Sequence, residues 1–337
     1  MGTRRVCGGM LLVTAVTLAL AVGCSNGGGA VNAQLEKPVL TVAVDPGVDS
    51  AGFFIALDQG LFTAQGLTVN FVAATSSQTA IAGQVAGAYD ITGGNYVSYI
   101  QAQQQRTADL YIFAEGSVMG PGTQGIYTTP GSPVKTLAGL EGQTVAINAP
   151  NNVSYLLTAS VLTEHGVSPA SVHFVTISFT EMPAELESGA VSAAVMVEPF
   201  ASDEEEVQGG VPIADLDQGA TTSFPVDGYA VTKQWAAKHP RTLAAFYAAL
   251  EQGQRIADAS RAAVESAMVE MPAPFGVAAK TAAVMALDNY PFSSGPVGSV
   301  DKVRLQRVVD VMQQFLNSPA FNISSMLMGN GRGRATG

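Results

Sequence analysis

The chain is poor in the residues that build metal and redox sites. It has two cysteines, three histidines and one tryptophan among 337 residues. Cys7 and Cys24 both lie near the N-terminus, so the rest of the chain has no cysteine for a disulfide or a thiolate metal site. His165, His173 and His239 lack the spacing of a metal-binding motif. We therefore predict no metal and no cofactor.

Charged residues are also scarce, and basic ones most of all. Only 13% of the chain is charged, with 16 basic and 27 acidic residues and a formal net charge of −11. Basic residues cluster only near the N-terminus and at Arg332–Arg334. This excludes nucleic-acid binding, which needs clustered lysine and arginine. The apolar fraction of 47% is too high for a disordered chain and is sufficient for one large or two modest cores.

Motifs of several common enzyme classes are missing. The sequence contains no G-x-S-x-G nucleophile elbow, no H-E-x-x-H zinc motif and no G-x-x-x-x-G-K-[ST] phosphate loop. The sequence therefore favours a binding protein over an enzyme.

The first 23 residues differ in composition from the rest. Arg4 and Arg5 precede an apolar run over residues 10–22, which is shorter than the roughly 20 residues of a spanning helix. A basic start, a short apolar run and small residues at its end are typical of a signal peptide. We therefore expect residues 1–23 to be removed on export.

The end of this segment, Leu20 to Cys24, resembles the bacterial lipobox, in which the cysteine receives diacylglycerol. Ala21 occupies the place where that pattern prefers leucine. The resemblance implies lipidation of Cys24 and an anchor on the outer face of the cytoplasmic membrane. Residues 24–37 begin with a polar, glycine-rich run and would form a flexible tether.

One stretch, Leu40 to Phe62, organises the rest of the chain. Residues 40–44 are apolar and β-branched, a polar loop follows at 45–50, and apolar residues then recur at helical spacing from Phe53 to Leu61. A strand, a loop and a helix in this order place the loop at the carboxyl end of a strand, where open α/β sheets bind ligands. We interpret residues 45–50 as the first wall of a ligand cleft.

Further strand-like segments alternate with helical patterns along the chain, which predicts an α/β fold. The predicted strands span 68–72, 87–91, 110–114, 144–147, 172–177, 193–197 and 226–232. One predicted helix ends at residue 85. The other principal predicted helices span residues 155–163, 182–186, 241–259, 261–269 and 301–316.

Three blocks carry a family resemblance. Residues 60–69 are similar to a G-x-F-x-x-x-G-L-x-V block, and residues 139–146 to an L-x-G-K-x-V/I-A block with Gln143 at the lysine. Residues 192–199 are similar to a D-A-x-x-x-x-E-P block with Ser192 at the aspartate. These blocks resemble the SsuA/THI5-like family of solute-binding proteins, which serve ABC importers for nitrate, sulfonates, taurine and a thiamine pyrimidine precursor. The likeness covers about residues 38–290.

The resemblance implies a type II periplasmic-binding-protein fold, with two α/β lobes joined by hinge crossovers. Lobe 1 would comprise residues 38–117 and 225–337, and lobe 2 residues 118–224. The partners implied are a small polar solute with nitrogen or sulfur, an ABC permease and its ATPase, and we expect a monomer. A ligand-sensing lipoprotein that signals to a membrane partner is the alternative, and catalysis in the same cleft is a third reading.

Candidate ligand-binding residues lie in the loops that follow the strands. Up to five of them are acids and none is Lys or Arg, which disfavours a bare anion and suits an amine or an aminopyrimidine. Helix N-termini in the same loops would instead suit a sulfonate. The candidates are Asp45, Gly47, Asp49, Ser50, Ser76, Ser77, Gln78, Asn95, Tyr96, Glu115, Asn148, Asn151, Asn152, Ser154, Glu198, Thr222, Phe224 and Asp227.

Some candidates also admit a purely structural role. Asp49 and Ser50 could simply cap the helix that follows them. The Glu198–Pro199 pair could form a turn at a crossover. Tyr96 or Phe224 would supply a surface on which a ring stacks.

Overall fold

The structure is a computed structural model that describes residues 34–292 and 296–328. The predicted signal peptide, Cys24 and most of the predicted tether lie outside the described residues. Within the described part of the chain, every helix is too short or too polar to cross a membrane.

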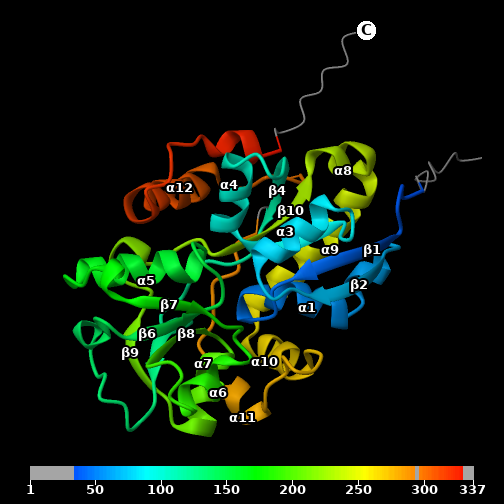
Figure 1. Cartoon of the computed structure of the whole chain (residues 1–337). Helices are drawn as coiled ribbons and strands as arrows, with labels where there is room; N and C mark the ends of the chain where they lie inside the picture. The colour runs from blue at the N-terminus through cyan, green and yellow to red at the C-terminus, as the bar shows by residue number, and fades with distance from the viewer. Residues whose placement is uncertain (1–33, 293–295, 329–337) are drawn as a thin grey trace, which may run out of the picture. The chain divides into compact units, whose positions relative to one another are not determined.

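A first mixed sheet has the strand order β2-β1-β3-β10-β4 (Figure 1). The strands β1, β2 and β3 are parallel, and β10 runs antiparallel between β3 and β4. Their bounds are Val39–Val44 for β1, Thr68–Ala73 for β2, Ile91–Asn95 for β3, Leu110–Glu115 for β4 and Asp227–Thr232 for β10.

A second mixed sheet repeats this pattern with the order β7-β6-β8-β5-β9. Its parallel strands are β6, β7 and β8, and β5 runs antiparallel between β8 and β9. The sequence patterns did not identify β5 and β9. The bounds are Gln124–Thr128 for β5, Thr144–Ile147 for β6, His173–Thr176 for β7, Ala193–Val197 for β8 and Val211–Asp215 for β9.

Helices connect the strands, so the α/β prediction is confirmed, whereas the exact lobe boundaries remain a prediction. The helices are α1 Ala51–Asp58, α2 Leu61–Ala64, α3 Ser77–Val85, α4 Tyr96–Gln104, α5 Val153–Glu164, α6 Met182–Glu187, α7 Phe200–Asp203, α8 Lys233–Lys238, α9 Pro240–Ala259, α10 Arg261–Glu270, α11 Ala279–Val284 and α12 Lys302–Leu316. Short 3-10 or π turns include η1 Val48–Ser50 and η4 Glu204–Gln208.

Strand β3 differs from its prediction. The sequence predicted a strand over 87–91 and a loop at 93–96, but β3 runs from Ile91 to Asn95 and α4 begins at Tyr96. Gly93 and Gly94 suggested a loop, but they lie in the strand at positions where neighbouring side chains leave no room for a Cβ atom. A Cβ atom on Gly93 would lie 2.8 Å from the Tyr229 ring, and one on Gly94 would lie 2.5 Å from Ser77 Oγ. Glycine in a strand often marks such a close approach.

Helix α1, which follows the 45–50 loop, is held by α9. A Cβ atom on Gly253 of α9 would lie 2.1 Å from the Gly52 carbonyl oxygen, so the two helices meet backbone to backbone. The ring of Phe53 is buried on the sheet side of α1, 5.6 Å from the Phe62 ring centroid. This packing positions α1 and the loop before it.

Three chain segments pass between the two sheets and pair with one another. Val118 exchanges backbone hydrogen bonds of 2.9 Å with Asn289, and the Met119 amide donates to the Phe224 carbonyl over 2.8 Å. Helix α12 binds the middle segment, because Arg307 donates to the carbonyl oxygens of Thr222 and Ser223. We call the segments 116–123, 216–226 and 285–290 the crossover segments.

Candidate functional site

The candidate site lies at the edge of the first sheet where β1 and β3 end and β10 begins. Because β10 is antiparallel to its neighbours, its first residue lies at the same edge as the carboxyl ends of β1 and β3. Asp45 follows β1, Asp49 lies in η1, and Asp227 opens β10 opposite Asn95. The sheet thus brings together three of the predicted acids.

Asp45 belongs to a hydrogen-bond network of predicted residues. Ser77 Oγ donates to Asp45 Oδ2 over 2.6 Å and accepts from the backbone and side-chain amides of Asn95 over 2.9 and 2.8 Å. Asp45 Oδ1 is buried and has no hydrogen-bond partner among the residues that the structure describes. Burial raises the pKa of Asp45 to about 7, and the charge of Asp49 acts in the same direction.

A fourth acid, Asp288, joins this group from the third crossover segment. Asp227 and Asp288 are only 6% and 5% exposed, and burial together with the charge of Asp49 raises the pKa of both well above the usual range. The Ser117 hydroxyl donates to Asp49 over 3.2 Å, and the Gly120 amide donates to Asp288 over 3.3 Å. The sequence patterns missed Asp288, which follows no predicted strand.

Asp45 lines a pocket of about 80 Å³ together with Asn148 and three aromatic rings. A pocket of this volume has room for only one end of an organic molecule, because sites for whole ligands usually need at least ~300 Å³. The rings are Phe179, Phe200 and Phe275. Phe179 follows β7, so the rule that identified the other loops would also have found it.

The predicted stacking rings lie elsewhere. Tyr96 and Phe224 are 1% and 0% exposed, and both pack within the hydrophobic core. The Tyr96 ring fills the space beside Gly228, where a Cβ atom would lie 2.4 Å from it. Neither ring has a face open to a solute, whereas the three phenylalanines line the pocket.

Polar residues that follow β6 of the second sheet form the side of the pocket that lies across from Asp45. Asn148 Oδ1 accepts from Asn152 Nδ2 over 2.5 Å and from Ser154 Oγ over 3.0 Å. Asn152 also caps α5, since its Oδ1 accepts from the Tyr155 amide. These contacts fix Asn148 at the pocket.

Two glutamines from α3 and α4 bind the backbone of the same loop. Gln78 Nε2 donates to the Pro150 carbonyl over 3.3 Å, and Gln101 Nε2 donates to the Asn151 carbonyl over 2.6 Å. Asn151 has a φ of 52° and presents its carbonyl rather than its side chain to this contact. These bonds connect helices of the first sheet to the loop after β6.

Glu198 has the contacts of a structural residue. Its carboxylate accepts from the Ser202 amide over 3.1 Å, the Ser202 hydroxyl over 2.8 Å and the Ala286 amide over 3.0 Å. Its carbonyl accepts from the Val48 amide over 3.0 Å, and Gly47 packs against that carbonyl. The geometry therefore fits the structural alternative for Glu198 and gives Gly47 a packing role.

Ser50 and Ser76 of the predicted set make hydrogen bonds to nearby backbone atoms. The Ser50 hydroxyl donates to the Asp45 carbonyl over 3.0 Å, and neither Ser50 nor Asp49 makes a side-chain cap to α1. Ser76 caps α3 by accepting from the Thr79 amide over 3.3 Å.

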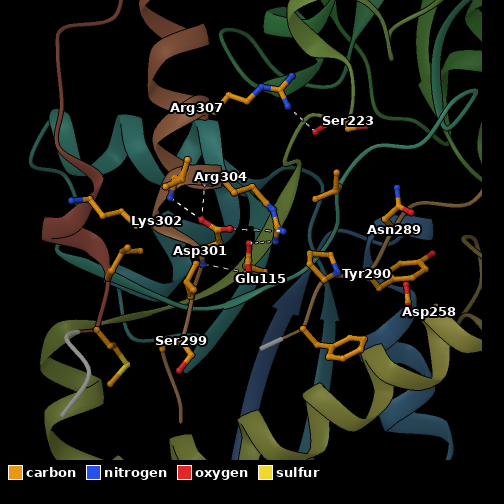
Figure 2. Close-up of a pocket in the computed structure, with 18 residues that line it drawn as sticks. Glu115, Ser223, Asp258, Asn289, Tyr290, Ser299, Asp301, Lys302, Arg304 and Arg307 are labelled. Carbon is orange, nitrogen blue, oxygen red and sulfur yellow. Dashed lines mark hydrogen bonds and ion pairs between the residues drawn. The ribbon is translucent and has the colours of Figure 1, made fainter. Parts of the chain in front are cut away.

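Neither Glu115 nor Thr222 lines the pocket that contains Asp45. Glu115 lines an open pocket of about 1290 Å³, in which Figure 2 shows its carboxylate facing the Arg304 guanidinium. Arg304 Nη1 lies 2.6 Å from Glu115 Oε1. Thr222 is exposed, and its carbonyl accepts from Arg307. No Lys or Arg was predicted in the candidate loops, and the base that meets Glu115 comes from outside them, because α12 brings Arg304 from far along the chain.

Comparison with known proteins relates this chain to a protein family. A family model described as NMT1/THI5 like matches residues 48–261. No relative was found among curated proteins.

Solved structures show the same fold at low identity. The alkanesulfonate-binding protein SsuA from Xanthomonas axonopodis pv. citri, bound to MOPS, is 16% identical over 87% of this chain and 99% of its own, with a TM-score of 0.69. The nitrate-binding protein NrtA from Synechocystis PCC 6803 is 16% identical over 86% and 85%, with a TM-score of 0.69.

The Candida albicans CA3427 gene product, described as having the generic periplasmic binding protein fold, is 17% identical over 86% and 95%, with a TM-score of 0.69. These likenesses confirm the predicted periplasmic-binding-protein fold with two α/β lobes. Because the family model matches more than half of the sequence, the chain belongs to the NMT1/THI5-like family.

Proposed function

We propose that this protein is the extracytoplasmic solute-binding subunit of an ABC importer, and that it acts as a monomer which closes on one small organic solute. The family and the two-lobed fold support a binding role. The pocket between Asp45 and Asn148 supports a site between the lobes, with the crossover segments as the hinge. The protein would release its solute to a membrane permease that is driven by an ATPase.

The chemistry of the pocket indicates the class of solute. The observation that carries the proposal is Asp45 Oδ1, a buried carboxylate oxygen without a partner in the wall of an aromatic pocket. A buried acceptor of this kind is stabilised by an N–H donor, most strongly by a cationic one. Phenylalanine faces add cation–π or stacking contacts. A solute rich in N–H donors, such as an amine, amidine or aminopyrimidine, fits better than a sulfonate or nitrate.

Three probes of one shape separate these classes. Benzamidine is a flat cation, benzamide its neutral analogue and benzenesulfonate an anion. Isothermal titration calorimetry at pH 7.5 should rank their affinities in that order, because the acids repel the anion. Asp45→Asn should weaken benzamidine binding about tenfold, since it removes one charged hydrogen bond.

A matched control is Asp109→Asn, which changes an aspartate that is largely exposed and paired with Lys233. This variant should bind benzamidine like the unchanged protein. Tighter binding of benzenesulfonate than of benzamidine would contradict the proposed solute class. Equal weakening by Asp45→Asn and Asp109→Asn would contradict the proposed place of Asp45.

The proposed membrane anchor rests on the sequence around Cys24. In a bacterial host, Cys24→Ser should move the protein from the membrane fraction to the soluble fraction, because the acceptor of the lipid is lost. Immunoblots of the separated fractions measure this change. Retention of the variant on membranes to the same extent would contradict lipidation at Cys24.

A further inference from the structure

Four carboxyl groups lie close together beside the candidate site, two from the 45–50 loop and two from separate segments. Asp45 follows β1, Asp49 lies in η1, Asp227 opens β10 and Asp288 lies in a crossover segment. Their mutual charges contribute to the pKa shifts of Asp45, Asp227 and Asp288. In the described part of the chain, none of the four forms an ion pair with a lysine, arginine or histidine.

The carboxyl groups of this cluster lie too close together to be ionised at the same time without cost. Burial and the neighbouring Asp49 both raise the pKa of Asp288. Among the described residues, Asp288 Oδ2 has no hydrogen-bond partner, and no hydrogen bond lowers the pKa of Asp227. Both side chains are more than nine-tenths buried, and the donors to Asp288, Gly120 and Thr123, leave its Oδ2 without a partner among the described residues.

The groups around the cluster do not neutralise it. Tyr99, Tyr229 and Tyr290 face it from α4, β10 and the third crossover segment, and all three are neutral because burial and the nearby acids raise their pKa values. Two of these hydroxyls are already engaged, Tyr99 with the Thr92 carbonyl and Tyr290 with the Val48 carbonyl. Arg304 is engaged by Glu115. Protons therefore supply the counter-charge in the empty site.

We propose that binding of a cationic solute displaces a proton from this carboxyl cluster, so that the site exchanges protons for its solute. The proposal rests on the proposed function. In the exchange, a solute N–H⁺ donates to Asp45 Oδ1, the Asp45 carboxyl group becomes a carboxylate, and its proton passes to the solvent. Charge and atoms balance because one cation enters and one proton leaves. Asp45 is the point of exchange because it lies both in the pocket wall and in the cluster.

This exchange predicts how affinity depends on pH. The pKa of Asp45 in the empty site is raised to about 7, and a bound cation lowers it. Affinity should therefore rise about tenfold per pH unit below pH 7 and level off above it. At pH 7, about half a proton should leave the protein for each benzamidine bound.

Calorimetry in two buffers measures these protons directly. Benzamidine is titrated at pH 7 in phosphate and in Tris, which take up protons with different heats. For the unchanged protein, the apparent binding enthalpy in phosphate should differ from that in Tris. The Asp109→Asn variant should show the same difference between the two buffers. Equal enthalpies with normal binding would overturn the exchange while leaving the proposed function intact. Absence of benzamidine binding would overturn both the exchange and the proposed solute class.

Infrared spectroscopy tests the stored protons without any ligand. The unchanged protein at pH 7 should show the C=O stretch of protonated carboxyl groups, and Asp288→Asn should weaken that band because it removes one buried carboxyl group of the cluster. Circular dichroism verifies that the variant is folded. A spectrum without this band at pH 7 would overturn the proposal whatever the probe does.

Discussion

Replacing Gly253 by valine should lower the free energy of unfolding by about 3 kcal/mol or more. A Cβ atom at this position would lie 2.1 Å from the Gly52 carbonyl oxygen and 2.9 Å from the Ala56 Cβ. The nearest obstacle is backbone, which cannot rotate away as a side chain can, so α9 has to move off α1. Overpacking of this kind costs ~1–3 kcal/mol where side chains can adjust and more where they cannot. Urea unfolding followed by circular dichroism measures the difference.

The control for this change is Gly131→Ala. The φ angle of Gly131 lies outside the left-handed region, and no heavy atom lies within 4 Å of the place that the added methyl group would occupy. The variant should therefore unfold like the unchanged protein. If Gly253→Val and Gly131→Ala had equal stability, the close contact between α1 and α9 would be refuted. Because α1 follows the 45–50 loop, Gly253→Val should also weaken benzamidine binding.

Replacing Glu204 by glutamine should stabilise the protein by about 2–3 kcal/mol at pH 8 and hardly at all at pH 5. Glu204 is 1% exposed in the η4 turn, and within the described part of the chain neither of its carboxylate oxygens has a hydrogen-bond partner. Burial, and then the charges of Glu187 and Asp203, raise its pKa from 4.5 to about 7. Each unit of such a shift corresponds to ~1.4 kcal/mol.

The sign follows from proton binding. Between pH 4.5 and 7 the unfolded chain has lost the Glu204 proton while the folded protein keeps it, so the contribution of this group to stability falls as pH rises. Glutamine remains neutral and avoids that loss. Thermal unfolding at pH 5 and pH 8 tests the difference, with the exposed Glu206 of the same turn changed to glutamine as the control. A gain in stability that is the same at both pH values would refute the buried charge.

The site shows how far local patterns reach. Asp45, Ser77 and Asn95 follow strands or begin helices of the first sheet, and the rule that loops after strands meet at one edge of a sheet placed them together. Asn148 follows a strand of the second sheet and meets Asp45 at the pocket. The same rule would have found Phe179. It could not find Asp288 or Phe275, because neither follows a strand and each reaches the site only through the folding of the C-terminal third.

Some residues were misjudged because a pattern cannot show what faces a side chain. Glu198 was chosen as a ligand contact, yet its carboxylate is occupied by Ser202 and by Ala286. The candidate loops contain no Lys or Arg that could pair with Glu115, yet Arg304 comes to it from α12. Phe224 was expected to meet a ring, yet it lies in the core.

The sequence by itself determined the α/β class, the order of most strands and helices and the family blocks, because these depend on short-range periodicity and composition. Tertiary structure alone decided that Gly93 and Gly94 lie in a strand, since the Tyr229 and Ser77 side chains that require them are distant in sequence. It also decided which acids share the site. Burial and charge pairing depend on contacts between distant segments, and no local pattern records them.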